Sequence, residues 1–121
     1  MKTLQDIIEY KKNEILDEKV SLTITEMHER MSKNNPPRGF LNALISNKSK
    51  FGIISEVKKA SPSKGIIRQD FDHIKIAESY EKSGATCLSV LTDSNFFQGK
   101  NSYIKDIKMS VNLPVLRKDF I

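Results

Sequence analysis

Short apolar runs alternate with amphipathic stretches through the second half of the sequence, and this alternation restricts the possible folds most. Runs that suit buried strands occupy residues 52–57, 86–91 and 113–116. The stretches between them, 70–84 and 103–111, carry apolar residues at helical spacing. The runs recur at roughly the thirty-residue spacing of βαβ units. We therefore predict an α/β fold with a parallel sheet and right-handed crossovers.

Two architectures begin with this order of elements: an open, doubly wound sheet and an eight-stranded barrel. Periodicity alone does not separate them. A complete barrel needs eight strands and about 250 residues, whereas this chain has 121 residues and three expected strands. If the fold is a barrel, we expect the chain to be a truncated N-terminal portion of it.

The first fifty residues have a different pattern, which predicts helices without strands. Thr3 is a plausible N-cap for a first helix, because Asp6 three residues later completes a capping pattern. A second helix is expected over 23–32, and a short third one ends near Asn47. We therefore expect a helical extension at 1–50, followed by the strands at 51–121.

Composition and charge limit the possible partners and compartment. The net charge of +5 favours anionic partners, but the basic residues are interspersed with acidic ones, as on an ordinary solvated surface. The single cysteine, Cys87, lies in an apolar run and is expected to be a small buried hydrophobic residue. Without a disulfide, and without an apolar run near the ~20 residues of a membrane span, the sequence suggests a cytoplasmic protein with no membrane partner.

Charged side chains follow the predicted strands, where parallel α/β folds bind their ligands. Glu56 and Lys58 lie two residues apart, so they point to the same face of their strand. Asp93 follows the second run, and Lys118 follows the third. All should lie on one rim, where two lysines and a glutamate form a plausible acid–base set. Each of these residues taken alone is more often structural than catalytic.

Other features favour structural roles. The stretch 61–65 is expected to form a turn. A pair such as Phe96-Phe97 more often packs against other hydrophobic residues than it lines a substrate site. His28 and His73 are expected to be surface residues on helices, and no metal-binding motif is present. The sequence also lacks a glycine-rich dinucleotide fingerprint and a phosphate loop.

Three segments together resemble the indole-3-glycerol-phosphate synthase family. They are ISEVKKASPSKG at 54–65, LSVLTDSNFFQG at 88–99 and LPVLRKDFI at 113–121. They resemble the family's first three barrel strands and the loops that follow the first two, in the right order and at the right separations. The helical region before Phe51 also resembles the family's N-terminal extension. The resemblance thus covers almost the whole chain and implies the beginning of a TIM (β/α)8 barrel.

The resemblance also implies an activity. Members of the family are carbon–carbon lyases of tryptophan biosynthesis, and they use no cofactor. They close the ring of 1-(2-carboxyphenylamino)-1-deoxyribulose 5-phosphate, with loss of carbon dioxide and water. The expected partner is therefore a small anionic, phosphorylated substrate.

Six residues match functional positions of the family. Lys118 matches the general acid of ring closure, Lys58 matches a lysine that contacts the substrate anion and helps dehydration, and Glu56 belongs to the same acid–base set. The expected substrate-binding residues are Ser61, Phe97 and Phe120. Ser61 matches a substrate-contacting serine, and the two phenylalanines match apolar walls of the anthranilate pocket. Lys59, Ala60 and Lys64 depart from the residues that many relatives carry at these positions.

Alternative functions remain at this point. A second phosphate-binding barrel of the same pathway, such as phosphoribosylanthranilate isomerase, would carry different residues at its strand ends and lacks the N-terminal helices. A non-enzymatic anion- or nucleic-acid-binding module fits the charge, but no basic stripe is interleaved with exposed aromatic residues. We expect no nucleic-acid partner. The truncated barrel is expected to be inactive alone, and its exposed strand edges are expected to make it self-associate or rearrange.

Overall fold

A computed structural model describes residues 2–121 of the chain. The chain divides into two compact units. The first is Met1–Pro36 together with Phe120, and the second is Pro37–Asp119 together with Ile121. Among the described residues, no helix is both long enough and apolar enough to cross a bilayer.

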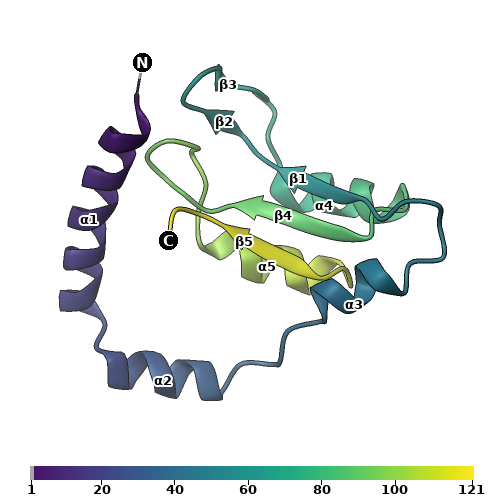
Figure 1. The fold of residues 1–121 in the computed structure, drawn as a ribbon, viewed down its shortest axis with the longest axis horizontal. Helices are drawn as coiled ribbons and strands as arrows, with labels where there is room; N and C mark the ends of the chain where they lie inside the picture. The colour runs from purple at the N-terminus through teal and green to yellow at the C-terminus, as the bar shows by residue number, and fades with distance from the viewer. Residues whose placement is uncertain (1) are drawn as a thin grey trace. The chain divides into compact units, whose positions relative to one another are not determined.

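The first unit consists of two helices, α1 (Leu4–Ser21) and α2 (Ile24–Ser32) (Figure 1). Each begins with a capping box, in which the N-cap threonine and an acidic residue three positions later bind each other's backbone amides. Thr3 donates its amide to Asp6 Oδ2 at 2.7 Å, and Thr23 donates its amide to Glu26 Oε2 at 2.8 Å. The predicted start of the first helix at Thr3 is confirmed, and the second helix also matches its predicted range.

The second unit is built on a parallel sheet with strand order β1-β4-β5. Its strands are β1 (Ile54–Val57), β4 (Cys87–Leu91) and β5 (Val115–Lys118). Figure 1 shows the three arrows pointing the same way, with β4 in the middle. The predicted parallel α/β arrangement is therefore confirmed, and the described residues form an open sheet rather than a closed barrel.

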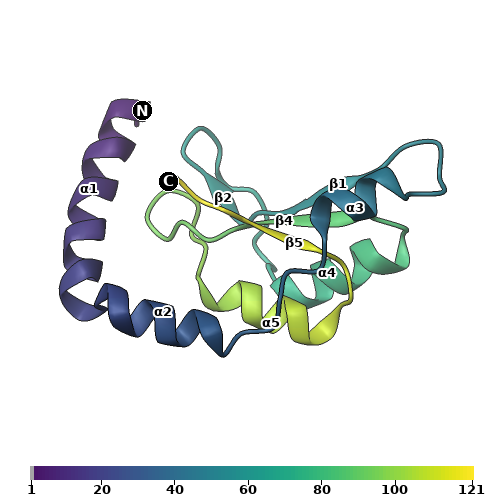
Figure 2. The same cartoon turned by 60° about the horizontal axis from the view of Figure 1, so that its bottom comes forward.

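Two helices cover one face of this sheet, α4 (His73–Lys82) and α5 (Ser102–Ser110) (Figure 2). The core lies between them and the sheet, and it consists of Val57, Ile76, Ala77, Leu88, Val90, Tyr103, Ile107 and Val111. Because side chains alternate along a strand, Val57, Leu88 and Val90 share the helix-covered face. The residues between them point to the opposite face, which we call the open face.

A third helix, α3 (Phe40–Ile45), belongs to the same unit as the sheet. It lies near the beginning of β4, where the thiol of Cys87 donates to the carbonyl of Phe40 at 3.6 Å. Cys87 is fully buried, as predicted, and it is a free cysteine. Arg38, just before this helix, donates to the carbonyls of Lys108 and Val111 at 2.7 Å each and thereby caps the end of α5.

The structure refines the ends of α4. This helix begins at His73 rather than near Asp70, because the carboxylate of Asp72 accepts the amides of Ile74 and Lys75 as an N-cap. Gly84 ends the region as predicted. Its φ of 90° is left-handed, which glycine adopts at little cost.

Two other predictions about local structure need correction. The 61–65 stretch is not only a turn, because it connects β2 (Ala60–Ser61) to β3 (Gly65–Ile66) in a short antiparallel hairpin. The third parallel strand begins at Val115, after the proline, and extends to Lys118. Both differences arise from backbone pairing with segments that hydrophobic periodicity does not reveal.

His73 is a further correction, because it is not an isolated surface residue. Its Nε2 lies 2.9 Å from Asp106 Oδ2, and its ring stacks on Tyr103 with 4.2 Å between centroids. These contacts join the start of α4 to α5. His28, in contrast, is exposed on α2, as predicted.

Candidate active site

The carboxyl ends of β1 and β5 bring three charged side chains together. Lys118 donates from Nζ to Glu56 Oε2 at 2.6 Å, and Lys58 Nζ lies 3.0 Å from the other carboxylate oxygen, Oε1. Glu56 therefore holds one lysine on each oxygen, across a sequence separation of 62 residues for Lys118. The structure confirms the expectation that these three residues share a rim. We call them the rim triad.

The sheet register explains this proximity. Glu56 lies opposite Ser89 of β4, and Lys118 lies opposite Leu91 of the same strand. Alternation places Glu56 and Lys118 on the open face, on either side of the central strand. Long side chains can therefore meet above β4, where Ser89 is small.

Opposing effects set the ionisation of Glu56. Partial burial acts to raise the pKa of its carboxyl, but the hydrogen bonds from Lys118 and Lys58 and their positive charges outweigh it, so the pKa lies below its ordinary value of 4.5. The Glu56 side chain is 29% exposed, while that of Lys118 is 52% exposed. The triad therefore presents an ionised carboxylate and two ammonium groups that a ligand can reach. Such a set can bind an anion, donate a proton and accept one.

Ser89 lies beneath the triad on the open face of β4. It is 5% exposed, and its hydroxyl has no hydrogen-bond partner among residues 2–121. Sequence reasoning missed this position. The available signal was a single hydroxyl residue inside the apolar run 87–91, in register with Glu56.

Asp93 does not contribute an exposed charge to the rim, contrary to the sequence prediction. Its side chain is buried, and its Oδ1 accepts the amides of Phe96 at 2.6 Å and Phe97 at 3.1 Å. Its carbonyl also accepts the amide of Gly99 at 2.7 Å. Asp93 thus shapes the loop between β4 and α5, and it orients the backbone that carries Phe97.

The three predicted binding residues lie in the segments that follow the strands. Ser61 ends β2 and accepts the amide of Lys64 at 3.3 Å, which stabilises the hairpin turn. Phe97 is half-buried in the β4–α5 loop, while its neighbour Phe96 is buried. Phe120 is half-buried two residues beyond Lys118. The roles of all six predicted site residues stay predictions.

A second residue missed by sequence reasoning is Tyr80, whose hydroxyl donates to the main-chain carbonyl of Glu56 at 3.0 Å. No sequence signal identifies this bond, because it joins a helix residue to a backbone atom 24 positions away. It connects the helix-covered face to the residue at the centre of the rim triad.

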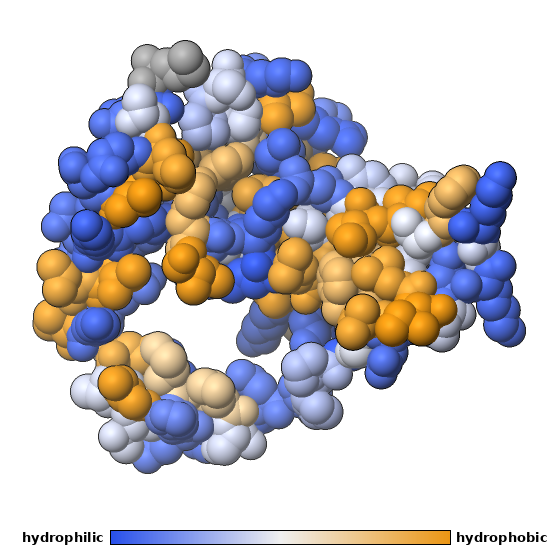
Figure 3. All heavy atoms as spheres, viewed as in Figure 1, coloured by the Kyte–Doolittle hydropathy of each residue, from blue (hydrophilic) through white to orange (hydrophobic). Residues whose placement is uncertain are grey.

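The open face combines charged and apolar regions. In Figure 3, hydrophobic atoms gather over α3 and the beginnings of the strands, and hydrophilic atoms lie over the strand ends. Leu41 and Ile45 are exposed on α3, and Ile54 and Leu116 are half exposed on the open face of the strands. The rim triad therefore borders a hydrophobic surface.

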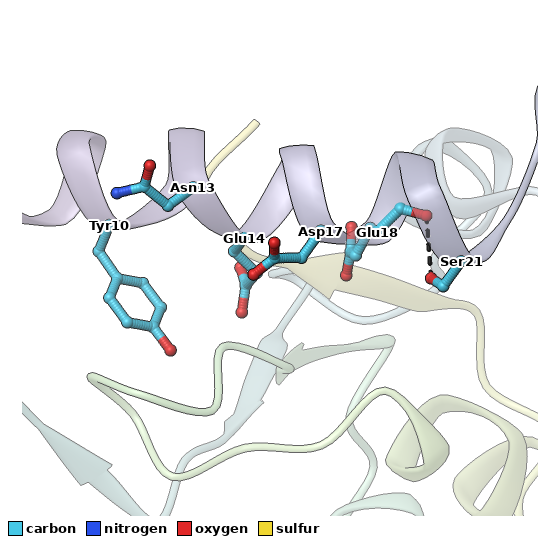
Figure 4. Close-up of a pocket in the computed structure, with 6 residues that line it drawn as sticks. All are labelled: Tyr10, Asn13, Glu14, Asp17, Glu18 and Ser21. Carbon is cyan, nitrogen blue, oxygen red and sulfur yellow. Dashed lines mark hydrogen bonds between the residues drawn. The ribbon is translucent and has the colours of Figure 1, made fainter.

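A separate pocket of about 420 Å³ lies along α1 in the first unit (Figure 4). It is lined by Tyr10, Asn13, Glu14, Asp17, Glu18 and Ser21. None of the residues predicted to be functional lines this pocket. Within the described part of the chain, no group of three or more His, Cys, Asp or Glu residues could hold a metal ion.

Comparisons with known proteins agree with the resemblance. The sequence profile of the family described as "Indole-3-glycerol phosphate synthase" matches residues 4–121. Proteins of that name from Bacillus licheniformis, Prochlorococcus marinus subsp. pastoris and Acaryochloris marina are 52%, 47% and 43% identical to the chain. Each alignment covers 98% of this chain, but only 43%, 40% and 39% of the respective relative.

The matched part is the N-terminal part of these relatives, so the chain spans about two fifths of their length. The family fold is a TIM barrel, and the open β1-β4-β5 sheet with its covering helices corresponds to the beginning of one. Family profile, identity and fold all lead to one assignment: the chain belongs to the indole-3-glycerol phosphate synthase family.

Proposed function

We propose that this chain provides the first catalytic residues of an indole-3-glycerol-phosphate synthase, a carbon–carbon lyase of tryptophan biosynthesis. The observation that carries the proposal is the pair of lysines held on one carboxylate, with Lys118 and Lys58 on the two oxygens of Glu56. The proposed substrate is the small anionic 1-(2-carboxyphenylamino)-1-deoxyribulose 5-phosphate. Two accessible cations at the rim suit such an anion.

The proposed roles follow from the chemistry. Ring closure joins a ring carbon to a carbonyl, and the oxygen that becomes negative needs a proton donor. Lys118 is the proposed donor, because its side chain is the more exposed of the two. Lys58 binds the substrate anion and assists the loss of water. Glu56 orients both ammonium groups and exchanges protons with them.

The proposed substrate-binding residues are Ser61, Phe97 and Phe120. The exposed apolar surface beside the triad supports a binding site for the aromatic ring of the substrate. The reaction as proposed needs no cofactor, since proton transfers suffice for condensation, decarboxylation and dehydration. The free, buried thiol of Cys87 fits the reducing cytoplasm, where we propose that the enzyme acts.

We further propose that the chain is inactive alone. A (β/α)8 barrel places its phosphate site after strands 7 and 8, whereas the described residues contain three parallel strands. The first experiment is ring closure by the chain, alone and mixed with a polypeptide that corresponds to the remaining part of a relative. Indole fluorescence should increase in the mixture only. Full turnover by the chain alone, or none in a mixture of folded and associated partners, would contradict the proposal.

The open sheet supports self-association of the isolated chain. Both outer strands have an unpaired edge in the described residues, and Ile54 and Leu116 are half exposed on the open face. We propose that isolated chains associate through this surface. Light scattering should show oligomers that dissociate when the complementing polypeptide is added, whereas a monodisperse monomer would contradict this part.

A nucleic-acid-binding module remains the alternative function, because the net charge is +5. The structure offers an observation against it: both rim lysines are engaged by one carboxylate and do not form a continuous basic stripe. A tight, steeply salt-dependent affinity for nucleic acid would favour the alternative.

A further inference from the structure

The hydroxyl of Tyr80, a helix residue, contacts the main chain of β1. It donates to the carbonyl oxygen of Glu56 at 3.0 Å, near the carboxyl end of the strand. Tyr80 belongs to α4, and it is partly buried against the core on the helix-covered face. A side chain of the helix layer therefore binds the main chain of the residue whose carboxylate forms the rim triad.

The direction of that carbonyl follows from the sheet register. The carbonyl of Ile53 accepts the amides of Thr86 and Cys87, so it faces β4. Backbone groups of successive strand residues point alternately to the two neighbours. The carbonyl of Glu56, three residues further on, therefore points away from β4 toward the outer edge of β1, where no other strand of the described chain is paired.

Tyr80 thus supplies the hydrogen bond that the sheet does not supply there. The bonded carbonyl belongs to the peptide unit between Glu56 and Val57, and the orientation of this unit determines where the strand end directs its side chains. The carboxylate of Glu56 must reach Lys118 at 2.6 Å and Lys58 at 3.0 Å at the same time. A small rotation of the strand end would lengthen one of these contacts.

We propose that Tyr80 is a positioning residue for Glu56. The Tyr80 hydroxyl fixes the outward-facing carbonyl of Glu56 and so keeps the Glu56 carboxylate between the two lysines. The inference rests on the proposed function, because that proposal is what makes Glu56 important for catalysis. Its test measures ionisation rather than turnover. A failure of the inference can therefore be distinguished from a failure of the proposed function.

The test compares Tyr80→Phe with Tyr103→Phe in the 121-residue chain. Both variants remove one tyrosine hydroxyl and keep the ring in the same helix layer, but only Tyr80 bonds to β1. The carboxyl carbon of Glu56 is titrated by ¹³C NMR. Without the positioning bond, the lysines stabilise the carboxylate less, and its proton affinity should rise about two- to fivefold in Tyr80→Phe. Tyr103→Phe should titrate like the wild type.

An unchanged midpoint in a folded Tyr80→Phe variant would overturn the inference, and so would equal shifts in both variants. If Tyr80→Phe does not fold, 3-fluorotyrosine at position 80 decides instead, because it keeps the ring and donates more strongly. The carbonyl carbon of Glu56 should then shift downfield and the proton affinity of its carboxyl should fall. A titration of Glu56 that does not change with the fluorinated residue contradicts the proposal.

Discussion

The two faces of the β1-β4-β5 sheet differ in both packing and chemistry. On the helix-covered face, Leu88 and Val90 are fully buried between the central strand and α4 and α5. On the open face, Leu116 remains 47% exposed beside the rim triad. The first face therefore supplies most of the stability of this unit, and the second carries the charged groups with which a ligand can react. Alternating side chains of the same strands serve both purposes.

The largest expected effect is a difference in stability between two leucine substitutions. Leu88→Ala creates a cavity in the core and should lower the free energy of unfolding by about 2–5 kcal/mol. Leu116→Ala removes the same atoms from a half-exposed site and should cost less than about 1 kcal/mol. Urea denaturation followed by circular dichroism measures both. Measured at a dilution where the chains are dissociated, equal losses would contradict this difference between the two faces.

A smaller effect is expected at Arg38, which fastens the end of α5 to the segment before α3. Arg38→Ala removes three hydrogen bonds, those to the carbonyls of Lys108 and Val111 at 2.7 Å each and that to the carbonyl of Leu113 at 3.2 Å. The free energy of unfolding should fall by about 1–2 kcal/mol. Arg68→Ala is the matched control, since it removes an exposed ion pair between the Arg68 side chain and Asp70 and should cost less than about 0.5 kcal/mol. A loss no larger than that of Arg68→Ala would refute a stabilising role for Arg38.

The smallest effect concerns pH and the open face. The pKa of Glu56 is lower in the folded chain than its ordinary value of 4.5. Its ion pairs therefore stabilise the folded state fully above that value, and this contribution is lost as the pH falls toward the folded-state pKa. The stability advantage of wild type over Glu56→Gln should be under about 1 kcal/mol because the lysines are solvent-screened. It should shrink as the pH drops below about 4.5.

Chemical denaturation of both proteins between neutral pH and pH about 3 measures this dependence. Glu78→Gln, at an exposed position of α4, is the control. If the advantage of wild type over Glu56→Gln does not change over this range, Glu56 is not held by the two lysines in solution.

The sequence predicted those parts of the fold that depend on local signals. The capping threonines Thr3 and Thr23, the left-handed Gly84 and the apolar run of β4 each carry their information within a few residues. The hairpin around 61–65 was missed because two-residue strands are too short to show a periodic pattern. The start of α4 was placed too early because Asp70 and Asp72 are equally suitable as caps in the sequence.

For the site, the sequence could place Glu56, Lys58 and Lys118 on one rim, because parallel strands end at the same edge. It could not foresee the burial of Asp93, since that depends on the loop that folds back over its carboxylate. It also could not reveal the bond between Tyr80 and the carbonyl of Glu56, because that bond depends on how α4 packs against β1. Contacts across the fold require the register and the helix packing together.

The most direct test of the central claim compares two neighbouring residues of β5 that point to opposite faces. Lys118 joins Glu56 on the open face, whereas Arg117 contacts Asn101, the N-cap residue of α5, and Asp119. Ring closure is measured in a mixture of the chain and its complementing polypeptide. Lys118→Ala should lower the rate about 10²–10⁴-fold, while Arg117→Ala should change it by less than about tenfold. Equal losses in the two variants, or full activity without Lys118, would contradict the assignment of catalysis to the open face.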